Sequence, residues 1–177
     1  MKRFGLFVKC FLMVLCMAMS VCGVKAQGGV EFPYPQIPTM MTEPQQRATY
    51  LLMHYWDNVD FKDMKLVANE DFMEQGFVNY LSVLPIVDAQ TAERSVEAMM
   101  KRAEVNVVAY KKLVNIAEKY LFEPNSPMVS DEMYIMFLNQ VMKTSVLSKV
   151  EKARFEYQHK VVMKNRVGSV ATDFLYI

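Results

Sequence analysis

Apolar side chains recur every three or four residues through most of the chain, which is the spacing that one face of an α-helix requires. The first such stretch follows Thr42, a good N-cap residue, with Pro44 in the first turn and Gln45 at the capping-box position. Its apolar face comprises Ala48, Leu51, Leu52, Tyr55 and Trp56. The pattern predicts a helix there, followed by a loop or short turn over 58–66.

Three more helices are predicted to begin after the N-cap residues Asn69, Asp88 and Ser130, and Pro85 ends the first of them. Their apolar faces include Met73, Phe77, Leu84, Ala92, Val96, Met99, Met133, Met136, Phe137 and Val141. The stretch 105–122 carries the same pattern, and the sequence leaves open whether it is a separate helix or continues the preceding one.

The stretch 123–127 contains two prolines and two turn-forming residues, so it must interrupt the helical pattern. A last helix is expected from about Ser148 to Lys164, with Val150, Tyr157 and Val161 facing inward. No hairpin signal and no sustained alternation occurs before Val167.

These patterns predict an all-α fold. We expect five to six antiparallel helices over 43–165, in an irregular bundle-like array. A small solenoid is also compatible, although no convincing internal repeat is present.

The stretch 166–177 has a different character, because a glycine turn is followed by strand-forming residues. We expect a short C-terminal extended segment. An isolated strand leaves its backbone groups unpaired, so we interpret these residues as the truncated start of a further domain.

The stretch 1–26 has the features of a signal peptide: Lys2 and Arg3, an apolar run, and small side chains before Gln27. Cleavage before Gln27 predicts an exported, periplasmic protein. A lipoprotein acylated at Cys22 is the alternative, which the branched Val21 just before it disfavours.

All three cysteines, Cys10, Cys16 and Cys22, lie within this signal. The mature chain therefore has neither disulfides nor thiol redox chemistry of its own. Removing the signal leaves 16 basic and 19 acidic residues from the original 20 and 19, a charge near −3. We therefore expect no nucleic-acid partner, and membrane attachment only through a lipidated Cys22.

Residues 27–42 form a proline-rich linker, with Phe32-Pro-Tyr-Pro and Ile37-Pro favouring extended backbone. Its apolar side chains suggest that it lies along the helical domain. A proline-rich docking ligand is the less favoured interpretation.

His54 and Asp57 are three residues apart and could form an acid–base pair or hold a metal. However, nothing completes a set of three or four ligands. We favour an exposed histidine at a helix end, with Trp56 in the core.

Twelve of the sixteen methionines follow the signal. They could line an adaptable peptide-binding groove or bind copper(I), but their spacing favours core filling. Since no phosphate loop, catalytic triad or inward-facing carboxylate pair is present, we predict no catalytic residue, cofactor or metal.

Several stretches resemble a helical domain of unknown function that precedes thioredoxin-like domains in envelope proteins of gut Gram-negative anaerobes. They are Phe32-Pro-Tyr-Pro, 47–58, 118–127 and 164–174. Within them, the candidate interaction surface consists of His54, Trp56, Asp57, Tyr120, Pro124, Asn125 and Pro127.

The last stretch is similar to the lead-in of thioredoxin-like reductases and peroxiredoxins, with Gly168, Ala171 and Phe174 fitting and Thr172 replacing a usual proline. The resemblance implies an exported thiol–disulfide protein whose Cys-x-x-Cys would lie beyond Ile177. It predicts a non-catalytic accessory domain whose partner is a thioredoxin-like domain in cis or an envelope protein. The alternative is a stand-alone envelope protein that binds a peptide or ligand.

Overall fold

The computed structural model of the protein describes residues 30–164, all of whose regular elements are helical. They are α2 (Pro44–His54), α3 (Met64–Ala68), α4 (Glu70–Val83), a 3₁₀ turn (Leu84–Ile86), α5 (Ala89–Ala103), α6 (Val107–Leu121), α7 (Asp131–Lys143) and α8 (Lys149–Lys164). The all-α prediction is thus confirmed for these residues. The predicted signal peptide and C-terminal extended segment lie outside them.

The described part of the chain contains seven α-helices rather than the five to six predicted. The additional helix is α3, in the stretch expected to be a loop, where the Asp63 side chain accepts a hydrogen bond from the Lys65 amide. The stretch 105–122 is a separate helix, because α5 ends at Ala103 and Asn106 caps α6.

Side-chain caps begin the middle helices where the sequence indicates. Asn69, Asp88 and Ser130 accept hydrogen bonds from the amides of Phe72, Thr91 and Met133, at 3.0, 2.9 and 3.3 Å. The first helix differs from the prediction, because its N-cap is Glu43, with no capping bond from the side chain, and Thr42 precedes it.

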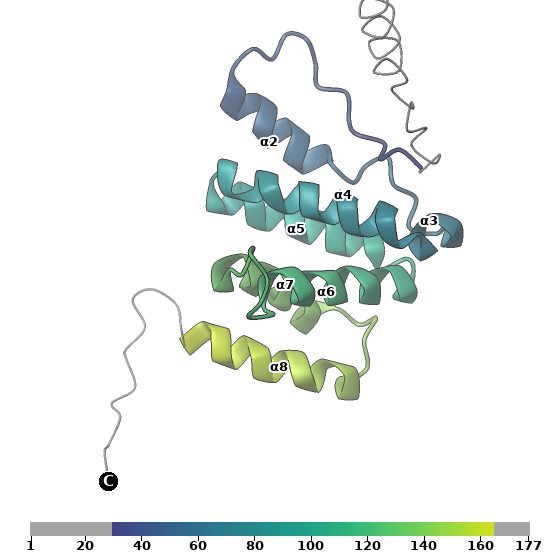
Figure 1. Ribbon diagram of the computed structural model, residues 1–177, viewed down its shortest axis with the longest axis vertical. Coiled ribbons are helices and arrows are strands. Elements are labelled where there is room, and N and C mark those ends of the chain that lie inside the picture. Colours follow the sequence, from purple (N-terminus) through teal and green to yellow (C-terminus); the bar gives the residue numbers. More distant parts are fainter. Residues whose placement is uncertain (1–29, 165–177) are drawn as a thin grey trace, which may run out of the picture. The chain divides into compact units, whose positions relative to one another are not determined.

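The helices lie in successive layers: α2, then α4 with α5, then α6 with α7, and finally α8 (Figure 1). Each layer packs on the next, α2 against α5, α5 against α7, α4 against α6, and α7 against α8. The antiparallel pairs are therefore stacked, in an order that also fits the small solenoid considered from the sequence.

The core between the layers is rich in large side chains. Tyr55, Tyr80, Tyr110, Tyr134, Phe77 and Phe137 are almost completely buried, together with Met73, Met99 and Met100. Met133, Met136 and Met142 pack against this core. Core filling is therefore confirmed for these methionines, whereas Met40 is 91% exposed.

Part of the N-terminal segment belongs to this packed unit. The Phe32 ring lies 4.9, 5.2 and 5.3 Å from the rings of Tyr55, Trp56 and Phe72. Asn58 and Asn79 donate hydrogen bonds to the Pro33 carbonyl and the Tyr34 hydroxyl, at 3.2 and 2.8 Å. The expectation that this segment lies along the helices is confirmed for residues 32–34.

The inward face of α8 differs from the prediction. Val150 and Tyr157 are 86% and 70% exposed, whereas Phe155 and Val162 are buried and Val161 is half-buried. The helix has apolar residues on two sides, and the side that carries Phe155 and Val162 packs against α7. Periodicity alone could not indicate which of the two apolar sides faces inward.

Candidate functional site

His54 and Asp57 come together at the end of α2. The Nδ1 atom of His54 lies 2.7 Å from Oδ2 of Asp57, and Arg102 of α5 donates a hydrogen bond to Oδ1 at 2.7 Å. The Tyr50 ring lies 4.4 Å from the imidazole. The carboxylate is thus shared by a histidine and an arginine, which fixes the imidazole as part of a surface ion cluster.

This cluster does not form a metal site. Within residues 30–164, no three His, Cys, Asp or Glu side chains are placed to hold a metal ion. Trp56, which the sequence assigned both to the core and to the candidate surface, is 3% exposed and packs on Phe61 and Phe32. Its indole therefore packs beneath the surface residues His54 and Asp57 and is not accessible to a partner.

The second part of the sequence-based surface lies at the end of α6. The Tyr120 hydroxyl donates a hydrogen bond to Glu74 of α4, which also pairs with Lys119. These contacts lower the pKa of Glu74, the Lys119 contact most, and raise the pKa of Tyr120. Tyr120 thereby ties α6 to α4.

The turn after α6 presents Pro124, Asn125 and Pro127 to solvent. Ser126 holds it in place by donating a hydrogen bond from its hydroxyl to the Tyr120 carbonyl, at 2.6 Å. Among the described residues, no hydrogen bond or ion pair joins this turn to His54 or Asp57. Because α2 and α6 belong to different layers, the candidate interaction surface is divided between the end of α2 and the end of α6 (Figure 1).

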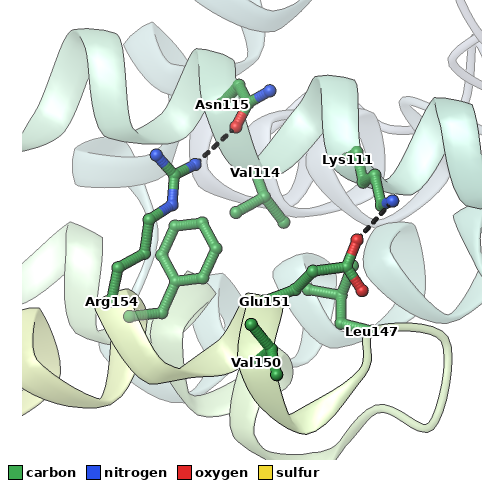
Figure 2. Close-up of a pocket in the computed structure, with 8 residues that line it drawn as sticks. Lys111, Val114, Asn115, Leu147, Val150, Glu151 and Arg154 are labelled. Atoms are coloured by element: carbon green, nitrogen blue, oxygen red, sulfur yellow. Dashed lines mark hydrogen bonds and ion pairs between the residues drawn. The ribbon is translucent and has the colours of Figure 1, made fainter.

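A different site lies between α6 and α8, where a groove of about 290 Å³ separates the two helices (Figure 2). Its apolar lining consists of the buried Val114, Leu147 and Phe155 and the exposed Val150. Figure 2 shows Val114 of α6 directed toward the space above α8. The layers are thus incompletely filled at this point.

Polar contacts cross the groove on both sides. Lys111 of α6 pairs with Glu151 of α8 at 2.5 Å, and Arg154 of α8 donates to Asn115 of α6 at 2.9 Å (Figure 2). Arg154 also pairs with Glu118 at 3.1 Å. The groove therefore has an apolar floor and a charged rim, which suits an apolar side chain with a polar neighbour.

Glu151 is held as a carboxylate by its surroundings. The Lys111 ammonium, followed by the hydroxyl and amide of Ser148, lowers the pKa of Glu151 to about 2. With its proton absent at neutral pH and its charge already paired, this carboxylate is a structural contact of the rim.

Sequence reasoning did not find this groove. Lys111, Glu118 and Arg154 belong to no motif in the sequence, because they come from two helices that meet only in the folded chain. Val150, which lines the groove, was predicted to face inward and is instead 86% exposed. The gap depends on how α8 sits on α7, which periodicity does not specify.

No curated protein matches the chain. Among solved structures, the chain is similar to a crystallised thioredoxin-like protein from Bacteroides caccae ATCC 43185, with 36% sequence identity and a TM-score of 0.76. The match covers 80% of this chain and 51% of the other, so the chain spans about half the length of that protein. In the described residues, no helix is both long and apolar enough to cross a membrane.

A family model described as a domain of unknown function, DUF5106, matches residues 16–165, which is most of the sequence. The chain belongs to this family.

Proposed function

We propose that this chain is the non-catalytic helical part of an exported thioredoxin-like thiol–disulfide protein. It acts as an accessory domain in the periplasm, positioning a redox module or controlling substrate access to it. The observation that carries the proposal is the likeness, at 36% identity, to one half of a thioredoxin-like protein.

The half of the Bacteroides caccae protein that this chain matches supports a non-catalytic role. Thioredoxin-like redox motifs accompany β-α-β units, whereas the residues described here contain only helices. The thioredoxin-like domain of the Bacteroides caccae protein would then lie in the half that this chain does not match. The stretch 166–177, which resembles the lead-in of such domains, would connect the two parts.

The distribution of cysteines agrees with an accessory role. Positions 27–177 contain no cysteine, so a chain cleaved before Gln27 would need its thiols from a second module. The basic and apolar pattern of 1–26 supports export to the periplasm. Acylation at Cys22 would instead anchor the same domain to the envelope.

A second candidate is a stand-alone envelope protein that binds a peptide or small ligand. The groove between α6 and α8 favours it, because its apolar floor and charged rim would accept an apolar side chain of a peptide. In this case no redox module is required.

Two measurements distinguish the accessory domain from the stand-alone binding protein. They are the source DNA sequence beyond the Ile177 codon and the intact mass of the native protein. We expect an open reading frame with a Cys-x-x-Cys pair and a correspondingly larger mass. A stop codon with a mass equal to residues 27–177 would refute the accessory role and leave the binding protein. A mass increased by acyl chains would identify Cys22 as the anchor.

A further inference from the structure

The carboxylates beside the groove between α6 and α8 are already occupied as hydrogen-bond acceptors. The Oε1 atom of Glu151 pairs with Lys111 at 2.5 Å, and its Oε2 atom accepts a hydrogen bond from the Ser148 hydroxyl at 2.6 Å. Glu118 is engaged in the same way. Its Oε1 atom accepts a hydrogen bond from Gln158 at 2.6 Å, and its Oε2 atom lies 3.1 Å from a guanidinium nitrogen of α8. Each of these four oxygens therefore has a partner within the protein.

The donor groups at the groove, in contrast, keep N–H bonds that no residue in the described part of the chain accepts. Arg154 contacts Asn115 and Glu118 through its Nη2 atom, at 2.9 and 3.1 Å, which leaves the N–H groups of Nη1 and Nε. Asn115 accepts at Oδ1, which leaves its Nδ2 group. The Lys111 ammonium uses one of its three N–H bonds on Glu151. The groove therefore has spare donors on two cations and one amide, and it fits a ligand that brings an anionic acceptor.

The spare donors lie next to the apolar part of the groove (Figure 2). The Cζ atom of Arg154 is 4.4 Å from the centroid of the Phe155 ring, so the guanidinium stacks on that ring. Leu147 and Val150 line the same space, whose volume of about 290 Å³ can hold one large apolar side chain. The geometry therefore suits a ligand whose carboxylate and apolar group are close together in the same molecule.

We propose that this groove binds the C-terminal residue of a polypeptide that ends in an apolar side chain. The α-carboxylate accepts hydrogen bonds from Arg154 and Asn115. The side chain lies on Leu147, Val150 and Phe155. A free C-terminal residue carries its carboxylate and its side chain on one carbon atom, whereas an internal Asp or Glu has no apolar group beside its carboxylate. The inference rests on the peptide-binding role considered above and names its ligand.

The charge of the groove agrees with this ligand. Among the residues that line it, the cations Lys111 and Arg154 stand against the single carboxylate of Glu151, a balance of +1. The α-carboxylate supplies the missing negative charge. Because the groove is partly apolar, a charge-assisted hydrogen bond is stronger there than in water.

Titration of the purified protein with short peptides tests the inference, followed by the NMR shifts of the amides of Val114, Asn115 and Leu147. The probe is the tetrapeptide acetyl-Gly-Ser-Gly-Leu with a free carboxylate. Its C-terminal amide removes the charge, and acetyl-Gly-Ser-Gly-Ser removes the apolar side chain. We expect each change to weaken binding about tenfold, because a charged hydrogen bond or a buried side chain is lost. These comparisons need no variant of the protein.

Four variants at exposed positions of α8 then locate the ligand. Arg154→Gln should weaken binding of the free acid about tenfold and leave the amide unchanged. Lys160→Gln is its matched control, because it removes the same charge outside the groove lining. Val150→Ser should weaken the acid and the amide alike, whereas its control Tyr157→Ser should bind both as the wild type does. Circular dichroism confirms that each variant is folded.

Equal binding of the acid and the amide would overturn the carboxylate as ligand and leave a groove that binds apolar side chains. Hexanoate that binds as tightly as the free-acid peptide would overturn the polypeptide terminus and assign the groove to aliphatic acids. If no peptide shifts the amides at the groove, the peptide-binding role fails together with this inference, while the accessory role is still decided by the DNA sequence and the mass.

Discussion

Gly76 allows the N-terminal segment to join the core. A β-carbon at position 76 would lie 2.4 Å from Cε2 and 2.6 Å from Cδ2 of the Phe32 ring, well inside van der Waals contact. The ring cannot simply turn aside, because Tyr55, Trp56 and Phe72 pack around it. The missing side chain is therefore a requirement for this contact.

We predict that Gly76→Ala lowers the free energy of unfolding by about 1–3 kcal/mol, the usual effect of overpacking. Urea unfolding of the purified mature domain measures it. In a Phe32→Ala background the same change should be neutral or stabilising, because the clash is gone and alanine favours helix. An equal loss in both backgrounds would show that Phe32 is not the cause.

Glu151 gives α8 an acid-sensitive contact. Its pKa is lowered from 4.5 to about 2, mainly by Lys111 and then by Ser148, so its contribution to stability is complete above about pH 4.5. The contribution disappears as the pH falls toward 2. We predict that the midpoint temperature of unfolding falls less steeply from pH 5 to pH 3 in Glu151→Gln than in the wild type.

Glu156→Gln is the control for this pH profile, since Glu156 is exposed on the same helix and no ion pair within residues 30–164 involves it. It should retain the steep wild-type decline. Identical profiles for wild type and Glu151→Gln would contradict a role for the Lys111–Glu151 pair.

The sequence predicted the contacts of some residues and not of others. Asn69, Asp88 and Ser130 act as caps because capping depends on atoms within one turn of the chain. The His54–Asp57 contact could likewise be anticipated from spacing. Arg102, its third member, comes from α5 across the fold, and no local pattern points to it.

Among the elements, α8 combines little apolar burial with several polar contacts to its neighbours. Only Phe155 and Val162 of this helix are buried. Gln158 accepts a hydrogen bond from the buried Tyr134 hydroxyl at 2.8 Å and donates one to Glu118 at 2.6 Å. Lys152 donates to the Met142 carbonyl of α7 and to the carbonyl of the C-cap residue Thr144. The helix is thus joined to α6 and α7 by a polar network.

We predict that Gln158→Ala destabilises the domain by about 1–3 kcal/mol, because it leaves the Tyr134 hydroxyl buried without its partner. Chemical denaturation provides the measurement. Adding Tyr134→Phe should recover part of the loss, since the unpaired hydroxyl is then removed. If the double variant is as unstable as the sum of both single changes, the bond does not carry the effect.

The same helix shows why element type was easier to predict than orientation. Its helical pattern was clear, but both Phe155–Val162 and Val150–Tyr157 have a seven-residue spacing. Which pair turns inward depends on the surface of α7. The five-residue α3 was missed for a related reason, because so short a segment gains its stability from tertiary contacts with α4 and α6.

At the scale of the whole molecule, the all-helical architecture followed from periodicity, while the groove depended on the assembled layers. The thioredoxin-like connection came from resemblance, since residues 30–164 contain no cysteine that could form a thioredoxin-like redox motif. In the layered stack (Figure 1), each helix contacts helices of its own layer or of adjacent layers, and this property predicts how the molecule opens.

We predict that α8 exchanges its amide hydrogens through a separate opening, before the layers formed by α4 to α7 unfold. It is the last layer of the described stack, and it buries two side chains where α6 buries seven. Native-state hydrogen exchange at increasing urea should give α8 a lower opening free energy and a smaller urea dependence than α6. A common isotherm for both helices would instead show that the stack unfolds as one unit. If α8 opens alone, the Lys111–Glu151 pair breaks with it, so acid that protonates Glu151 should lower the opening free energy of α8 first.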